Sequence, residues 1–323
     1  EVLKIIHQIK DESHRSTVLY KIIKILPTEL WPEALETIHQ IQKKSDKVEL
    51  LCLLAEYLPT GLWPEILEIT RHIEDGSQRS KALCKVIETL PNSSTKLWFK
   101  ALEITQQIED KYKQTDALSA LAQYLPELWP EVLEITHQIE DESHRSIALC
   151  KVVETLPNLS TELWFKALEI TRQIEDESKQ SNVLSKIAQY FPELCPEVLE
   201  ITRQIKDEFH RSTVLSKMLV HRPDLWLETL TTTGQIKNES SQSLILSHLI
   251  EKLPQELLSN VLEITRQIRD QSSRVSLLRQ LAQQRPELFT ETLVTIRQIR
   301  DESERTRSLS YTIPHLPLNF ISN

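Results

Sequence analysis

A repeat of 31 to 35 residues runs through almost the whole chain. An isoleucine, usually preceded by glutamine, recurs at ten positions: Ile9, Ile41, Ile73, Ile108, Ile139, Ile174, Ile205, Ile236, Ile268 and Ile299. A fixed period in this range is the sequence signature of a solenoid or a repeat array. We therefore treat the chain of 323 residues as one repeated unit, and we number positions in each unit from this isoleucine.

The unit at residues 128–156 predicts two short helices. Pro130 suits the first position of a helix, and the apolar residues from 132 to 139 follow a helical spacing. Asp141 and Ser143 can cap a second helix, whose apolar stripe continues to Leu156. Pro157 then ends this helix, because a residue that precedes proline disfavours the helical conformation.

Helices this short are marginal alone and bury their apolar faces only by stacking on neighbouring units. We predict an all-α fold, a right-handed superhelical α-solenoid of about ten two-helix repeats. The repeat array is expected to cover residues 1–310. Residues 311–323 are apolar and interrupted by prolines, and we expect them to form a C-terminal tail or cap.

The period, with an acid at Ile+2 and a base at Ile+6, resembles the short HEAT-like repeats of phycobilisome-lyase-type proteins. The Asp column is Asp11, Asp75, Asp110, Asp141, Asp176, Asp207, Asp270 and Asp301, and the basic column is Arg15, Lys47, Arg79, Arg145, Arg211, Arg274 and Arg305. The resemblance implies that Asp and Arg of successive repeats form a ladder along the inner turns. The glycine between the helices of that family is missing here, and Gln114, Gln180 and Gln242 interrupt the basic column.

Tetratricopeptide repeats are a second resemblance, but their 34-residue period and their Trp, Leu-Gly, Tyr pattern fit this chain less well. Repeat arrays that look like this one often form the sensor or scaffold part of large signalling proteins. The chain begins at Glu1, inside a repeat, and we expect it to be part of a larger protein of that kind.

Composition argues against several classes of function. The formal net charge of −9 disfavours a nonspecific binder of phosphate backbones, so nucleic acid is an unlikely partner. Three scattered glycines cannot build a phosphate-binding loop or a nucleophile elbow. We predict no catalytic residues and no cofactor, and we expect that the protein is not an enzyme. A lyase-like HEAT enzyme and a reader of single-stranded RNA remain minor alternatives.

Cysteine usage and hydropathy suggest where the chain works. Its four cysteines, Cys52, Cys84, Cys150 and Cys195, contain no C-x-x-C pair, which favours a reducing, cytoplasmic setting. The apolar runs are far shorter than the roughly 20 residues that a membrane helix needs, so we predict no membrane partner. Cys52, Cys84 and Cys150 share position Ile+11 with several serines, and small residues there permit close helix approach.

The column at Ile−2 carries the candidate binding site. It lies on the exposed face of the first helix, because two positions correspond to about 200° around a helix. The predicted partner-binding residues are Arg71, His137, Arg172, Arg203, Arg266 and Arg297. Arginine side chains suit carboxylate and phosphate, so the expected partner is a protein or peptide, with an acidic or phosphorylated peptide favoured. The alternative is a solvated face in which these bases pair with Glu residues three positions earlier, such as Glu68, Glu134 and Glu200.

Two other columns allow a structural and a functional interpretation. The aromatic column, Trp31, Trp63, Trp98, Trp129, Trp164, Trp226 and Phe289, fits packing between units better than a ligand platform. The Ile+1 column changes from Glu74, Glu109, Glu140 and Glu175 to Lys206, Lys237, Arg269 and Arg300. This change of sign either orients a partner or reflects drift at tolerant surface positions.

His137, Asp141 and His144 suggest a metal site, but their spacing is broken by the turn between the two helices, and we predict no metal. Together, these patterns favour a noncatalytic protein-interaction, sensor or scaffold module. The alternative is a structural protein that self-assembles by stacking its repeat ends, since terminal repeats without polar caps tend to associate.

Overall fold

The chain folds entirely into helices and turns. The computed structural model describes residues 2–57, 60–90, 95–155 and 161–317, and this part contains twenty α-helices and no β-strand. It divides into two compact units, an N-terminal unit of residues 1–171 and a C-terminal unit of residues 172–323. The prediction of an all-α chain is therefore confirmed for the described residues.

The N-terminal unit contains eleven α-helices, the last of which ends one residue beyond it. They are α1 (Val2–Gln8), α2 (Glu12–Ile22), α3 (Trp31–His39), α4 (Lys44–Ala55), α5 (Trp63–Arg71), α6 (Gly76–Thr89), α7 (Thr95–Gln106), α8 (Lys111–Ala122), α9 (Trp129–His137), α10 (Glu142–Thr155) and α11 (Thr161–Arg172). Short 3₁₀ turns at Thr28–Leu30, Thr60–Leu62 and Pro126–Leu128 lead into α3, α5 and α9. The sequence reasoning did not anticipate these turns.

The C-terminal unit contains nine further α-helices. They are α12 (Glu177–Tyr190), α13 (Cys195–Thr202), α14 (Glu208–Met218), α15 (Trp226–Gly234), α16 (Glu239–Ile250), α17 (Leu258–Gln267), α18 (Gln271–Gln284), α19 (Leu288–Gln298) and α20 (Glu302–Thr312). Helix α20 continues past residue 310 and is followed by a 3₁₀ turn at Ile313–His315, so the helical part of the chain extends beyond the expected boundary. Residues 318–323 of the expected tail lie outside the described part.

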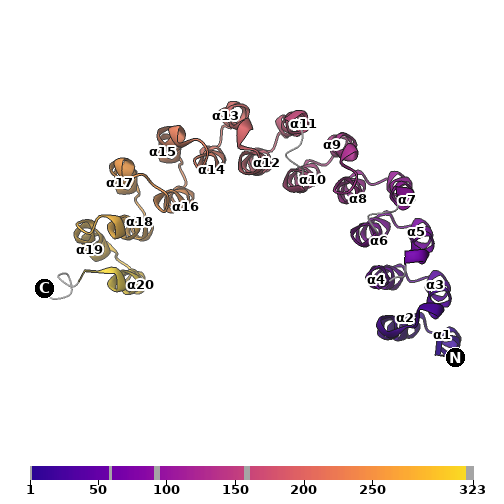
Figure 1. The fold of residues 1–323 in the computed structure, drawn as a ribbon. Helices are drawn as coiled ribbons and strands as arrows, with labels where there is room; N and C mark the ends of the chain where they lie inside the picture. The colour runs from indigo at the N-terminus through magenta and orange to yellow at the C-terminus, as the bar shows by residue number, and fades with distance from the viewer. Residues whose placement is uncertain (1, 58–59, 91–94, 156–160, 318–323) are drawn as a thin grey trace. The chain divides into compact units, whose positions relative to one another are not determined.

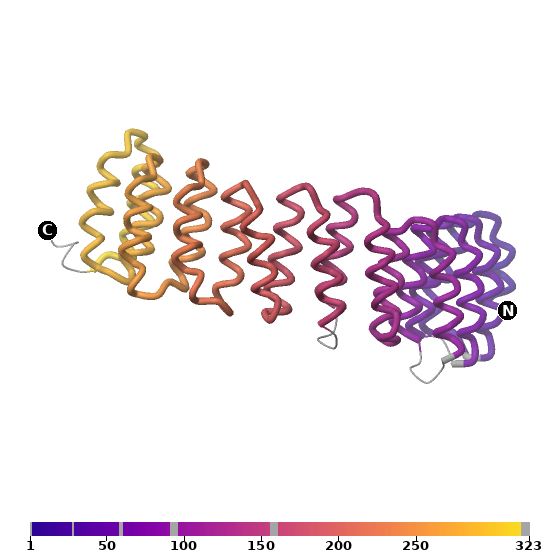
Figure 2. The backbone as a smooth tube through the Cα atoms, turned by 90° about the horizontal axis from the view of Figure 1, so that it is seen from above, coloured from indigo at the N-terminus to yellow at the C-terminus, as the bar shows by residue number. Residues whose placement is uncertain are grey.

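Within each unit the helices form two layers (Figure 1). In the N-terminal unit the even-numbered helices α2, α4, α6, α8 and α10 pack in succession, and α1, α3, α5 and α7 do the same on the other side. In the C-terminal unit the even-numbered layer consists of α12, α14, α16, α18 and α20. Figure 2 shows from above that neighbouring helices of a unit lie side by side and are joined by short turns at alternating edges.

The helix pair at residues 129–155 agrees with the pattern of the repeat. Helix α9 begins at Trp129 with proline in its first turn, and no side chain caps it. Helix α10 begins after Asp141, whose carboxylate accepts a hydrogen bond from the backbone N–H of His144 at 2.8 Å. Asp207 caps α14 in the same way through His210, at 2.9 Å, and Asp301 caps α20. The Asp column therefore supplies helix caps, as its position predicted.

The core of each unit is made of the apolar columns. Val132, Leu133 and Leu149 are fully buried, as are the corresponding residues of most other repeats. The aromatic column is buried throughout, from Trp31 to Phe289, with Cys195 and Leu258 in the two repeats that lack an aromatic residue there. Packing is therefore the role of this column, and the ligand-platform alternative is wrong because no ring face is accessible.

The Ile+6 column completes the hydrogen bonding at the end of each odd-numbered helix. Arg145 donates from Nη1 to the carbonyl oxygen of Ile139 at 3.1 Å, and Arg211 bonds the carbonyl of Ile205 at 2.9 Å. Gln180 reaches the carbonyl of Ile174 in the same way, at 3.1 Å. Carbonyl groups at a helix end have no partner within the helix, so these side chains satisfy acceptors that would otherwise stay partly buried and unbonded.

Successive repeats are tied at their turns by glutamates at Ile+3. The carboxylate of Glu239 accepts hydrogen bonds from the backbone N–H groups of Arg269, at 3.0 Å, and Asp270, at 2.7 Å. Glu177 bonds Lys206 and Asp207 of the next repeat in the same way. A ladder thus links these turns, but its acceptor is Glu at Ile+3 and its donors are backbone amides. The Asp column caps helices, and three arginines of the basic column also reach the next repeat: Arg79 donates to the carbonyl oxygen of Gln107 at 2.7 Å, and Arg211 and Arg274 donate to the side-chain oxygens of Gln235 and Gln298.

Candidate functional site

The Ile−2 column lies on the exposed surface of the odd-numbered helices. Arg71, His137, Arg172, Arg203, Arg266 and Arg297 are all exposed, as their position on the helix predicted. Arg71, His137 and Arg297 have no hydrogen-bond or ion-pair partner within the described residues. The other three are paired, so the column does not form one uniform stripe of free bases.

Arg203 and Arg266 each hold a glutamate of the next odd-numbered helix. Arg203 donates from Nε and Nη2 to the two carboxylate oxygens of Glu228, at 2.9 and 2.8 Å. Arg266 makes the same two-fold contact with Glu291, at 2.9 and 2.7 Å. These hydrogen bonds lower the pKa of each glutamate. The partly exposed pairs occupy the groups that an acidic ligand would use.

The glutamates three positions earlier are not the partners of these arginines. Glu68 pairs with Lys100 at 3.1 Å, and Glu134 pairs with Lys166 at 3.1 Å. Arg172 reaches Glu200 in the following repeat at 3.6 Å. The expectation of pairing within one helix is therefore wrong at these positions, because adjacent odd-numbered helices lie close enough for long side chains to cross between them.

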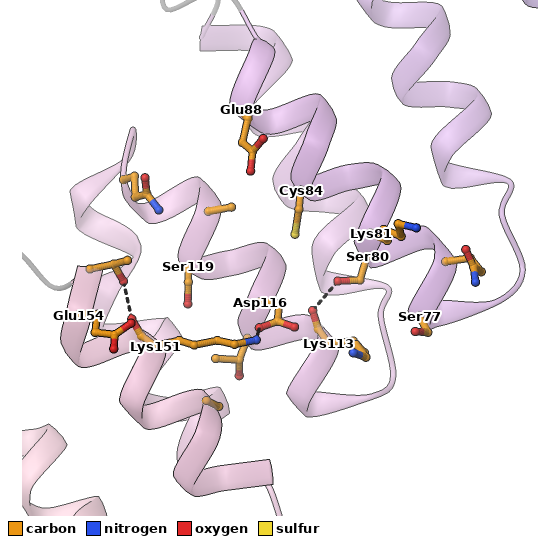
Figure 3. A pocket seen from close by; sticks show the side chains of 16 residues that line it. Ser77, Ser80, Lys81, Cys84, Glu88, Lys113, Asp116, Ser119, Lys151 and Glu154 are labelled. Carbon is orange, nitrogen blue, oxygen red and sulfur yellow. Dashed lines mark hydrogen bonds and ion pairs between the residues drawn. The ribbon is translucent and has the colours of Figure 1, made fainter. Parts of the chain in front are cut away.

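A groove crosses the even-numbered layer of the N-terminal unit, where sequence reasoning placed no site. It has a volume of about 530 Å³ and is lined by α6, α8 and α10 (Figure 3). Its lining residues are Ser77, Gln78, Ser80, Lys81, Cys84, Glu88, Lys113, Thr115, Asp116, Ser119, Ala120, Gln123, Ala148, Lys151, Glu154 and Thr155. Small and charged side chains predominate among these residues, and the groove is open to solvent.

Small residues keep the groove between the helices open. Cys84 on α6 and Ser119 on α8 occupy the Ile+11 position of successive repeats, and both line the groove. The hydroxyl of Ser119 has no hydrogen-bond partner within the described residues. Ser80 donates to the carbonyl oxygen of Lys113 at 2.9 Å, which joins α6 to α8. We had expected the Ile+11 residues only to permit close helix packing, whereas these two also line an open surface.

An ion pair spans the groove. Lys151 reaches from α10 to Asp116 on α8, where Nζ lies 2.9 Å from the carboxylate (Figure 3). It also donates to the hydroxyl of Tyr112 at 3.1 Å. Burial lowers the pKa of Lys151, but the hydrogen bonds to Asp116 and Tyr112 outweigh it, so the pKa is raised overall. The amine therefore stays protonated at neutral pH and can attract a carboxylate.

The thiol of Cys84 is not activated. Burial raises its pKa to about 12, with the nearby carboxylate of Asp116 acting in the same direction. A reactive cysteine needs a lowered pKa, which usually comes from a nearby cation or a helix N-terminus. The groove thus has the character of a binding surface, with a protonated lysine and a neutral thiol.

Two further predictions concern a metal site and a membrane-spanning helix. Within the described residues, no group of three or more His, Cys, Asp and Glu side chains could hold a metal ion. His144 instead approaches its helix cap, Asp141, at 3.4 Å and lies against the ring of Tyr112. None of the four cysteines forms a disulfide. None of the helices described is both long enough and apolar enough to cross a bilayer.

Comparisons with known proteins add little to this description. No protein-family model and no curated protein sequence matches the chain. The crystal structure of Ton1535 from Thermococcus onnurineus NA1 is similar over 91% of this chain and 98% of that chain, with 16% sequence identity and a TM-score of 0.30. A similarity this weak carries no argument about fold or function.

Proposed function

We propose that the chain is a noncatalytic peptide-binding module, built as a right-handed superhelical α-solenoid with HEAT-like repeats, that acts as a scaffold or sensor. The groove across α6, α8 and α10 is the observation that carries the proposal. An extended peptide can lie in such a groove because small side chains let its backbone approach the helices. Four cysteines without a disulfide are compatible with a reducing compartment, and we propose that this activity takes place in the cytoplasm.

The charged groups around the groove favour an acidic peptide. Lys81 is exposed and has no partner within the described residues, and Lys113 lies 4.7 Å from the centre of the Tyr112 ring. Lys151 on α10 is already paired with Asp116 at 2.9 Å. Asp116, Glu88 and Glu154 also line the groove, so a ligand that carries both signs of charge would gain further contacts. A peptide with carboxylates spaced for Lys81 and Lys113 is the ligand that this chemistry fits best.

The exposed Arg71 and His137 are separate candidates for partner contact. They lie on odd-numbered helices, α5 and α9, in the other layer from the groove. Arg297 on α19 is the corresponding free base of the C-terminal unit. Reversing Arg172, Arg203 and Arg266 to Glu would also break their existing ion pairs. Arg71→Glu and Arg297→Glu are therefore the cleaner variants for testing this surface.

The groove can be tested with random peptides displayed on phage. Peptides of roughly twelve residues span about 40 Å when extended, which is long enough to cross several helices. We expect enrichment of acidic sequences on the immobilised chain, and we expect Ser119→Trp to lower the affinity of an enriched peptide by at least about tenfold because the indole fills the groove. Ser185→Trp is the matched control, since Ser185 holds the same Ile+11 position in α12. Equal binding by both variants, or no enrichment over an unrelated protein, would overturn the proposal.

End-to-end self-association is a second candidate. Ile5 is 58% exposed, whereas the equivalent Ile104 is 1% exposed, and Leu309 is 37% exposed, whereas the equivalent Leu149 is fully buried. The two ends of the array thus present apolar faces that resemble opposite sides of a repeat junction. Light scattering over a range of concentrations tests this candidate. A mass that stays monomeric at high salt, where apolar contacts persist, would exclude it.

A further inference from the structure

At the turn between each odd-numbered helix and the following even-numbered helix, the Ile+1 residue is acidic in three of the five repeats of the N-terminal unit and basic in four of the five repeats of the C-terminal unit, with Lys10, Gln42 and Glu175 as departures. The Ile+1 residues of the N-terminal unit include Glu74, Glu109 and Glu140, which we call the acidic row. Those of the C-terminal unit include Lys206, Lys237, Arg269 and Arg300, which we call the basic row. All seven residues are exposed, so both rows lie at a surface.

The side chains of the basic row are unengaged. None of the four has a hydrogen bond or an ion pair from its side chain within the described residues. Lys206 and Arg269 bond the glutamate of the preceding repeat through their backbone N–H groups alone, at 3.0 Å in each case. These backbone bonds fix the turn and leave the ammonium and guanidinium groups available.

The acidic row is nearly as free. Glu109 and Glu140 have no partner within the described residues, and Glu74 pairs with Lys44 at 3.2 Å while 84% of its side chain remains exposed. The next residue in each of these turns is a helix-capping aspartate. Asp207, Asp270 and Asp301 occupy the same position in three of the basic turns, and Asn238 caps its helix in the fourth, so the two rows differ mainly in the sign of the Ile+1 residue.

We propose that two copies of this chain associate through these rows, with the acidic row of one copy facing the basic row of the other. Both rows use the same position of the repeat, one residue for each helix pair. Neighbouring helices pack about 8 to 10 Å apart, so carboxylates and cations recur at a similar interval in the two rows. The chain thus carries two rows of opposite charge with matching spacing. This complementarity favours a second copy over an unrelated acidic partner.

Ionic strength distinguishes this contact from association through the apolar ends and from peptide binding in the groove. Exposed ion pairs are individually weak, and charges interact over a Debye length of about 10 Å at 0.1 M salt, falling to about 3 Å at 1 M. The row contact therefore forms at low ionic strength and is lost at high ionic strength. Association through the apolar ends is expected to survive high salt, and peptide binding in the groove does not require a second copy.

The test uses the whole chain and two variants with reversed charges. Variant one carries Glu74→Lys, Glu109→Lys and Glu140→Lys, and variant two carries Lys206→Glu, Lys237→Glu and Arg269→Glu. Sedimentation velocity at about 25 mM salt should show a mass that rises with concentration for the wild-type chain and falls to the monomer at about 0.5 M. Each variant alone should stay monomeric, because its rows now repel, and an equimolar mixture of the two should associate.

A control variant distinguishes an effect of the basic row from an effect of net charge. Lys217→Glu, Lys252→Glu and Arg307→Glu change the net charge as variant two does, at exposed positions outside the turns that carry the two rows. This control should associate like the wild-type chain. A wild-type chain that is monomeric at low salt, association that persists in either row variant, or equal loss in the control would overturn the proposal. Peptide capture by the groove is measured separately, so a failure here leaves the proposed function standing.

Discussion

The guanidinium group of Arg203 holds both carboxylate oxygens of Glu228, 25 residues further along the chain, at 2.9 and 2.8 Å. Arg266 and Glu291 make the same contact two repeats further along the same layer. Two arginines that sequence reasoning assigned to partner binding thus link consecutive odd-numbered helices. The hydrogen-bond geometry of this pair is favourable, but both side chains are partly exposed to solvent, so we expect the pair to contribute little to stability.

A double-mutant cycle on Arg203→Ala and Glu228→Ala should give a coupling free energy below about 1 kcal/mol, because exposed ion pairs are weak even with two hydrogen bonds. Arg203 lowers the pKa of Glu228. This stabilisation is therefore complete above the ordinary glutamate pKa of about 4.3 and is lost as the pH falls through the lowered folded-state value. Urea unfolding at several pH values measures both effects. A coupling that does not decrease at low pH would contradict the assignment.

Replacement of Trp129 by alanine should destabilise the N-terminal unit by about 3 to 5 kcal/mol, because its side chain is 1% exposed and the substitution leaves a large cavity. The control is Phe99→Ala, in which a ring that is 58% exposed is removed. This substitution should lower the free energy of unfolding by no more than about 0.5 kcal/mol. Circular dichroism during urea unfolding provides the comparison, and similar losses in the two variants would count against a packing role for the aromatic column.

Replacement of Asp207 by alanine should cost about 0.5 to 2 kcal/mol, because the carboxylate caps α14 through the backbone N–H of His210. Asn is expected to retain most of the cap, as the native Asn238 caps α16 by the same type of bond to Ser241 at 2.9 Å. The hydrogen bond from His210 lowers the pKa of Asp207. Its contribution is therefore present above the unfolded pKa of about 3.9 and is lost as the pH falls through the folded value. Thermal unfolding of the Ala and Asn variants at neutral and acidic pH tests the ranking.

Cys84 should react slowly with thiol reagents in the folded protein. Its pKa of about 12 leaves almost no thiolate near pH 8, whereas an unperturbed thiol with a pKa of about 8.5 is partly ionised there. We expect labelling at least about tenfold slower than in the urea-unfolded chain, with the site identified by peptide mass spectrometry. Rapid labelling of folded Cys84 would show that the groove is more open or more polar than its lining indicates. A peptide bound in the groove should slow the reaction further.

Much of the secondary structure could be predicted because its determinants are local. Proline in the first turn, an Asp cap such as Asp141 and apolar spacing up to Ile139 act within one helix and its turn. Burial of Trp129 also followed from its place at a repeat junction. The 3₁₀ turn at Pro126–Leu128 was missed, since the equivalent Pro157 was interpreted only as the end of a helix.

The candidate site was much less predictable. Exposure of Arg71 and His137 follows from the helical period alone, and this part of the prediction is confirmed. Their role in binding stays a prediction. The groove was missed because Cys84 and Ser119 share a sequence column but belong to different helices, so nothing in the column shows whether they are covered or line an open surface.

The sequence by itself determined the period, the helix boundaries to within a few residues and the identity of the buried columns, because each depends on interactions within about one helical repeat. The tertiary structure alone decided which charges meet. Arg203 finds Glu228 rather than Glu200, and Lys151 finds Asp116, because helices from successive repeats lie side by side and long side chains reach across them. Pairing across repeats depends on the offset between packed helices, and that offset is set by the fit of their buried side chains rather than by any local pattern.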